Sequence, residues 1–144
     1  MIQFYTEDIS FDFHQLSNIP SWIESVVASE DFSLQEVNFI FCSDQYLLQI
    51  NIFYLQHDYF TDIITFDNSD QPGVIEGDIF ISIDRVQENS LLQQTSFINE
   101  LLRVVIHGIL HLMGYDDKDD NSKITMRKME DKCLSLYFSS FHKE

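Results

Sequence analysis

His107 and His111 are the residues whose type and spacing point most directly to chemistry. Four residues apart on a helix, they share a face, with azimuths about 40° apart at 3.6 residues per turn. Two imidazoles placed in this way can bind one divalent ion. Gly114 would end the helix, because glycine adopts the left-handed conformation without penalty. The turn could then bring Asp117 back to the ion, and two histidines, one carboxylate and an open fourth position make a catalytic zinc site.

The alternative for these histidines is an ordinary core or surface position, which is the more frequent role of a histidine in an apolar helix. Burying two histidines without a polar purpose costs free energy, so the spacing favours a metal site. Asp116 and Asp119 are rival carboxylate donors in the same acidic turn.

The histidines lie in a long apolar segment, which we expect to form a buried central helix from about Ser96 to Met113. Its second half is apolar on nearly all sides, which is typical of a helix enclosed by the core. Periodicity and capping residues predict the other elements. They are a strand near residues 2–5, a helix at 20–29 capped by Ser17 or Asn18, a buried strand at 37–42, a helix capped by Ser43 with Leu47, Ile50 and Tyr54 on its apolar face, a hairpin of 61–66 with 77–83, a short helix capped by Asp84, and a last amphipathic helix through Met126 and Leu136.

The run from His107 to Asp117 resembles the hallmark of the YbeY family of metal-dependent endoribonucleases and rRNA maturation factors, H-G-x-L-H-L-x-G-Y-D-H. Every fixed position matches except the last, where the family has a third histidine and this chain has Asp117. Residues 58–66 are similar to the family's D-x-x-T-D-V-L-S-F strand, and residues 77–82 are similar to its G-D-I-x-I-S strand. The order and spacing agree, so the resemblance covers roughly residues 37–117.

The resemblance implies a single α+β domain over residues 1–144 with a zincin-like fold, in which a mixed sheet of about four strands packs around the buried helix that carries the metal-binding histidines. It implies one Zn²⁺ ion, with His107, His111 and Asp117 as ligands, since zinc accepts oxygen as well as nitrogen. The implied function is that of a single-strand-specific endoribonuclease in maturation of the 3′ end of 16S rRNA and in ribosome quality control. The expected partners are ribosomal RNA and the small ribosomal subunit, and no DNA.

One departure from the family pattern concerns phosphate binding, because Leu55 stands where the family has an arginine after a tyrosine. Leucine cannot hold a phosphate. We hypothesise that Arg103, one turn before His107, takes over as a phosphate clamp. The alternative is that Arg103 pairs with Asp62, Asp78 or another acid of this acidic chain.

The histidine motif does not identify the general base of the reaction. Zinc peptidases with H-E-x-x-H use the glutamate after the first histidine as the base, and Gly108 occupies that position here. This argues against ordinary peptidase chemistry, and Gly108 could instead allow a strand or substrate to pack closely. Asp62 and Asp78 are candidate bases only if the fold brings them to the metal, since either could simply cap a turn.

The charge distribution is unusual for a protein that acts on RNA. The net charge is −16, and residues 1–84 hold 15 Asp and Glu but no Lys or Arg. Nucleic-acid binding normally relies on basic patches, so we expect weak binding of free RNA and presentation of RNA by ribosomal proteins or another nuclease. Six of the eight basic residues follow Asp117 and predict either a solvated helix face or a basic strip beside the metal: Lys118, Lys123, Arg127, Lys128, Lys132 and Lys143.

Length and composition support one cytoplasmic domain. The 144 residues suffice for one core, no run is long enough to span a bilayer, and the first residues lack the basic region of a signal peptide. Cys42 and Cys133 fit reduced thiols better than a disulfide framework. Two other functions stay open: a zinc hydrolase of another substrate, and a non-catalytic ribosome-assembly factor whose metal is structural, which a closed four-ligand site would indicate.

Overall fold

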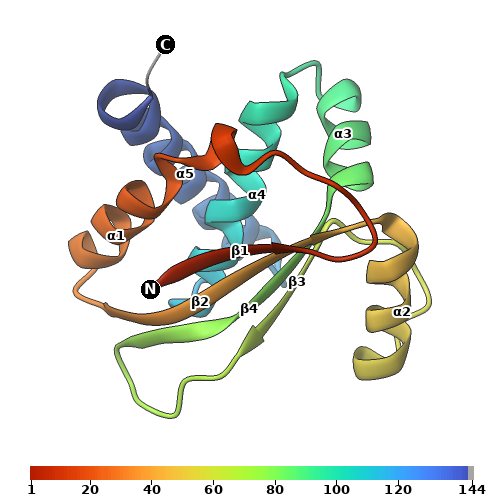
Figure 1. Ribbon diagram of the computed structural model, residues 1–144. Coiled ribbons are helices and arrows are strands. Elements are labelled where there is room, and N and C mark those ends of the chain that lie inside the picture. Colours follow the sequence, from red (N-terminus) through yellow and green to blue (C-terminus); the bar gives the residue numbers. More distant parts are fainter. Residues whose placement is uncertain (143–144) are drawn as a thin grey trace.

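Helix α4 (Phe97–Leu112) crosses one face of a four-stranded mixed sheet, and the rest of the fold is arranged around it (Figure 1). The computed structural model describes residues 1–142, which form an α+β domain. Its other elements are β1 (Ile2–Thr6), a 3₁₀ turn η1 (Phe13–Leu16), α1 (Ile19–Ser29), β2 (Ser33–Cys42), α2 (Asp44–Leu55), β3 (Ile63–Asp67), β4 (Val74–Ser82), α3 (Ile83–Leu92), α5 (Asp120–Leu136) and a π-helical turn η2 (Tyr137–Phe141).

The sheet has the order β1-β2-β4-β3, in which β1, β2 and β4 are parallel and β3 is antiparallel to β4. The expected hairpin is therefore confirmed, with Ile63 opposite Ile81. Because successive strand residues point to opposite faces, Phe39, Ile79 and Ile81 enter the main core with α1, α4 and α5. Ile64 faces the other way and joins a smaller cluster under α2.

Gly108 lies on the face of α4 that packs closely against the sheet. A Cβ atom built on this glycine would lie 3.0 Å from the Cδ1 atoms of both Ile63 and Ile79. The absence of a side chain therefore lets α4 pack on β3 and β4, which confirms the close packing of a strand that was expected as one role of Gly108. Glycine inside a helix costs about 1 kcal/mol relative to alanine, and close packing offsets that cost.

The ends of α4 agree closely with the expected helix from Ser96 to Met113. Ser96 is the N-cap, and its side chain accepts a hydrogen bond from the backbone N–H of Asn99 at 3.0 Å. Gly114 follows the last turn with φ of 105°, a left-handed conformation that glycine adopts without strain. The helix is thus stopped just before the acidic turn.

Three local predictions were wrong. Ser82, not Asp84, caps α3, because β4 ends at Ser82 and its hydroxyl accepts from the N–H of Arg85. Tyr54 is 63% exposed, and the buried face of α2 instead includes Asn51, which donates to the carbonyl of Tyr59 and holds the loop before β3. Helix α1 begins after Asn18 as expected, but without a side-chain cap hydrogen bond.

Two further expectations concern the environment of the chain. Cys42 and Cys133 are both buried free thiols, as expected. In residues 1–142, no helix combines the length and apolar character needed to cross a membrane.

Candidate metal and RNA-cleavage site

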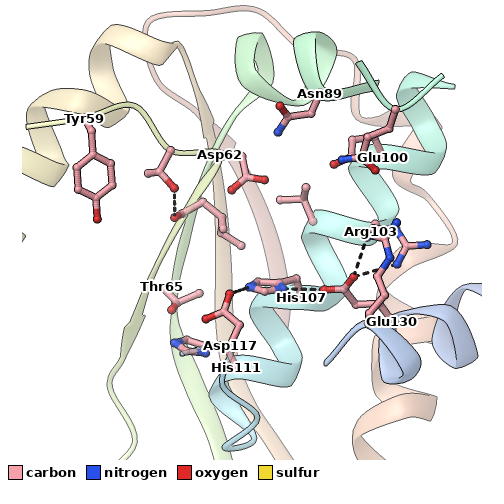
Figure 2. A pocket seen from close by; sticks show the side chains of 15 residues that line it. Tyr59, Asp62, Thr65, Asn89, Glu100, Arg103, His107, His111, Asp117 and Glu130 are labelled. Carbon is pink, nitrogen blue, oxygen red and sulfur yellow. Dashed lines mark hydrogen bonds and ion pairs between the residues drawn. The ribbon is translucent and has the colours of Figure 1, made fainter. Parts of the chain in front are cut away.

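A cleft of about 520 Å³ opens between the start of β3 and the exposed face of α4, with residues of α3 and α5 closing its sides (Figure 2). It contains five of the six residues that the sequence singled out for chemistry, and one of the five, Asp117, comes from the acidic turn. The lining residues used below are Tyr59, Asp62, Glu100, Arg103, His107, His111, Asp117, Arg127 and Glu130.

His107 lies in the middle of the cleft, between two carboxylates. Its Nε2 atom is 3.6 Å from Oδ2 of Asp117, and its Nδ1 atom is 2.7 Å from Oε2 of Glu130 (Figure 2). Burial alone would lower the pKa of His107, but the hydrogen bond and charge of Glu130, aided by Asp117, outweigh burial and leave the pKa above its usual value. The acidic turn therefore does return Asp117 to the face of α4 that carries the histidines.

His111 is more exposed and is fixed by the backbone. Its Nδ1 atom is 3.0 Å from the carbonyl oxygen of Tyr115, just beyond the end of α4. The rings of His107 and His111 are nearly parallel, with centroids 6.3 Å apart. The pair shares one face of α4, as their spacing predicted.

His107, His111 and Asp117 supply nitrogen and oxygen donors of the types that zinc accepts. The carbonyl of Tyr115 and the carboxylate of Glu130 can only accept hydrogen bonds, so a neutral His107 or His111 carries its proton on Nδ1 and leaves the Nε2 lone pair free. Two ligands of one tetrahedral zinc ion lie about 3.4 Å apart for bonds of about 2.1 Å, close to the separation of His107 and Asp117. As the side chains stand in residues 1–142, no group of three or more His, Cys, Asp or Glu residues is arranged to hold an ion.

The rival donors of the acidic turn have other roles. Asp119 caps α5 by accepting from the N–H of Ser122 at 2.7 Å, and this bond lowers the pKa of its carboxyl. Asp116 accepts from the N–H of Lys118 at 3.3 Å. Neither lines the cleft, so Asp117 is the acid of this turn that faces the histidines.

Glu130 lines the cleft and is an acid that the sequence did not single out. It belongs to α5, is 5% exposed, and accepts hydrogen bonds from both His107 and Arg103, the latter at 2.9 Å. A signal was present: Met126 and Cys133 lie four residues before and three after it on the buried face of α5. A carboxylate at the centre of an apolar helix face must have partners, because an unpaired buried charge is costly.

Arg103 is occupied by two ion pairs. Its Nη1 binds Glu130 at 2.9 Å and its Nη2 binds Asp131 at 2.7 Å. The structure therefore confirms the alternative in which Arg103 pairs with acids of this chain. Its partners are Glu130 and Asp131. Asp62 and Asp78, the two acids named from the sequence, are not its partners.

The two candidate bases are separated by the fold. Asp62 lines the cleft, and burial raises the pKa of its carboxyl, although the charge of His107 opposes the rise. Asp78 alternates with Ile79 along β4 and points to the opposite face, where Asn38 and Asn68 donate to its oxygens at 3.0 and 3.3 Å. Asp78 does not line the cleft, so it is removed as a candidate base.

Glu100 adds a second unpredicted acid to the cleft wall. It is 4% exposed, its Oε1 is buried without a hydrogen-bond partner, and burial raises the pKa of its carboxyl. It lies two turns before His107 on the same face of α4, so its spacing from His107 was the available signal.

The expected basic strip is reduced to one residue at the cleft. Among the basic residues after Asp117 that the structure describes, Arg127 lines the cleft and keeps 54% of its side chain exposed. Lys143 lies outside the described residues. Leu55, at the end of α2, is 42% exposed and is not part of the cleft wall.

Comparison with known proteins finds relatives over nearly the whole chain. The family described as endoribonuclease YbeY matches residues 1–137. A protein named endoribonuclease YbeY from Cytophaga hutchinsonii is 53% identical over 135 residues, which cover 94% of each chain. Another of that name, from Flavobacterium psychrophilum, is 48% identical over 95% of this chain and 96% of its own.

A solved structure shows the same fold. The solution structure of TM1509 from Thermotoga maritima superposes with a TM-score of 0.68 and 29% identity, over 96% of this chain and 93% of that chain. The sequence matches span nearly the whole chain and include the cleft. This chain belongs to the endoribonuclease YbeY family.

Proposed function

We propose that this chain is a zinc-dependent endoribonuclease that cleaves single-stranded RNA in the cleft between β3 and α4. The observation that carries the proposal is the pair His107 Nε2 and Asp117 Oδ2, which face each other at 3.6 Å inside that cleft. The name of the relatives, endoribonuclease YbeY, supports the reaction class.

His107, His111 and Asp117 would hold one zinc ion. A bound zinc ion supplies Lewis-acid chemistry, in that it makes water acidic, with a pKa of about 7, and stabilises negative charge that develops on a phosphate. Three protein ligands leave a position open, and the cleft is open beside them. The protein's part is to fix these ligands and to shape the cleft around them.

Asp62 is the residue we assign as general base. It lines the cleft, and its raised pKa brings the carboxyl closer to neutral pH, where a base exchanges protons most effectively. Its backbone carbonyl accepts from the N–H of Ser82 at 3.0 Å, which anchors the start of β3 to the end of β4. Asp62 would take the proton from the attacking water.

Two side chains are suited to hold RNA in the cleft. Tyr59 lines it with a ring that is 56% exposed, and a single-stranded base can stack on such a ring. Arg127 is 54% exposed and has one long ion pair, 3.8 Å from Nη1 to Glu130, whereas Arg103 uses both terminal nitrogens in ion pairs of 2.9 and 2.7 Å. Arg127 is therefore better placed than Arg103 to contact a phosphate.

The substrate we propose is the 3′ end of small-subunit rRNA, presented by the ribosomal subunit or by a partner protein in the cytoplasm. The net charge of −16 supports presentation, because a chain this acidic repels free RNA. A partner that holds the strand would supply the affinity that the cleft's few cations lack.

The other two functions have less support. In place of a peptidase base, Gly108 packs against Ile63 and Ile79. A structural metal would need a closed set of four ligands, whereas His107 and Asp117 face an open cleft.

The test is to map the 3′ end of small-subunit rRNA in cells depleted of this protein. Rescue by the wild type is compared with rescue by a His107→Ala, His111→Ala variant produced at the same level. We expect an extended 3′ end that only the wild type corrects. A normal 3′ end in depleted cells would contradict the proposed substrate.

A further inference from the structure

We infer that Glu130, itself oriented by Arg103, is a positioning residue that keeps the Nε2 lone pair of His107 directed into the cleft. Its importance for catalysis rests on the proposed function, but the positioning can be measured without RNA. Helix α5 would then act as part of the site, although none of the residues expected to bind the ion belongs to it.

The first step of the argument is the burial of Glu130. Its side chain is 7% exposed, and both of its oxygens are used: Oε2 by His107 at 2.7 Å and Oε1 by Arg103 at 2.9 Å. Met126 and Cys133 flank it on the buried face of α5. A carboxylate in this position is costly unless both partners are present, so the three side chains form one unit.

The second step is the role of Arg103. It lies one turn before His107 on α4, and its side chain is 16% exposed. A guanidinium stays charged at any ordinary pH, so it holds Glu130 as an acceptor. Its other partner, Asp131, is 59% exposed, so that pair is screened by solvent.

The third step is the consequence for His107. A neutral imidazole carries one N–H, and the short contact with Glu130 places it on Nδ1. Nε2 then presents its lone pair to the region of Asp117, 3.6 Å away. With the proton on Nε2 instead, His107 would present no lone pair to the cleft and could not bind a cation there.

Glu130→Gln tests this chain of contacts with little change in volume. A glutamine has one carbonyl oxygen, and both Arg103 and His107 need an acceptor. When that oxygen serves Arg103, the amide NH₂ faces His107 and forces its Nδ1 to accept, which moves the ring proton to Nε2. Removing such partners of a metal-binding histidine typically lowers metal affinity 10- to 100-fold.

Two measurements are made on each protein: the zinc dissociation constant, by competition with a chelating dye at pH 8, and the ring ¹⁵N shifts of His107 without metal. Asp131→Asn is the matched control, because it removes the exposed partner of Arg103 and leaves Glu130 intact. We expect Glu130→Gln to bind zinc 10- to 100-fold more weakly with the proton on Nε2, and Asp131→Asn to stay within about twofold of the wild type.

Unchanged zinc affinity and tautomer in Glu130→Gln would overturn the inference, since an ion pair that only ties α5 to α4 predicts that result. If this variant does not fold, the wild type decides: the neutral ring must carry its proton on Nδ1, and a proton on Nε2 contradicts the inference. Arg103→Leu should also weaken zinc binding. If Arg103→Leu binds zinc normally but no longer cleaves RNA, Arg103 is a phosphate clamp, and its positioning role is overturned.

Because neither measurement uses RNA, the two proposals can fail separately. A wild type that binds zinc through His107 but does not cleave RNA would contradict the proposed function alone. Cleavage that survives with unaltered zinc affinity in Glu130→Gln would contradict the positioning role alone.

Discussion

The Nδ1 atom of His111 and the carbonyl oxygen of Tyr115 lie 3.0 Å apart across the end of α4. The turn between them has paired hydrogen bonds, from the N–H of Gly114 to the carbonyl of His111 and from the N–H of Tyr115 to that of Leu110. This is a Schellman motif, with Gly114 in the left-handed position. The same turn therefore ends the helix and orients the second histidine.

Gly114→Ala should weaken zinc binding although it replaces no ligand. A Cβ has room there, with no neighbouring heavy atom within 4 Å, so the cost comes from φ of 105° and is about 1–2 kcal/mol. Relaxing this strain moves the Tyr115 carbonyl away from His111. Urea unfolding and zinc titration of the purified variant measure the two effects.

Gly73→Ala is the control for this strain. Gly73 has φ of 79°, also has no neighbouring heavy atom within 4 Å, and lies in the β3–β4 loop. We expect it to lose similar stability but to bind zinc as the wild type does. Equal zinc affinities for both alanine variants would mean that the Gly114 turn does not position His111.

Gly108→Ala should destabilise the domain by about 1 kcal/mol. Alanine gains about 1 kcal/mol in helix propensity, but contacts of 3.0 Å with Ile63 and Ile79 overpack the core at a cost of about 1–3 kcal/mol. Ile79→Val removes one of the clashing atoms. In a double-mutant cycle by urea unfolding, the pair should lose less stability than the sum of the two single variants, and strict additivity would contradict the packing role.

Local patterns predicted most of this fold from the sequence. Ser43 and Ser96 begin their helices and Gly114 ends α4 as expected, because caps and left-handed turns depend on neighbouring residues only. The burial of most of α4 followed from its apolar composition. The N-cap of α3 was predicted wrongly because Ser82 is both the last residue of β4 and the N-cap of α3.

The parts of the site that could not be predicted depend on how distant segments meet. The alternation of Asp78 with Ile79 shows that they point to opposite faces, but not which face α4 covers. The partners of Arg103 required the docking of α5 on α4. Glu130 was different, since its place between Met126 and Cys133 was visible in the sequence.

Replacing Asp117 should lower the affinity for zinc, whereas replacing its neighbour Asp116 should not. Asp117→Ala removes the carboxylate beside His107, and we expect at least a tenfold weaker zinc affinity by dye competition. Asp116→Ala is the matched control, because Asp116 is exposed and does not line the cleft. Asp117→His restores the residue that the family hallmark has here and should retain zinc. Undiminished binding by Asp117→Ala would shift the third-ligand role to another group.

Glu100 should make the stability of the metal-free protein decrease as the pH rises. Burial raises the pKa of Glu100 in the folded state, so this group favours folding most below its unfolded pKa, and that contribution is lost as the pH rises through the folded pKa. The loss is at most about 1.4 kcal/mol per pH unit. Urea unfolding of the wild type and Glu100→Gln between pH 4 and 8 should show a relative gain for the variant with rising pH. A constant difference would contradict the raised pKa.

The most direct test of the account is cleavage of a labelled single-stranded RNA by the purified, chelator-stripped protein with and without added zinc. The matched variant is His111→Ala, since His111 is exposed and its removal deletes one exposed hydrogen bond, to the Tyr115 carbonyl, at a small cost in stability. We expect zinc to restore cleavage to the wild type and to leave the variant at least a hundredfold slower. Equal cleavage by the stripped wild type, or by the zinc-supplemented variant, would contradict a metal-dependent site on α4.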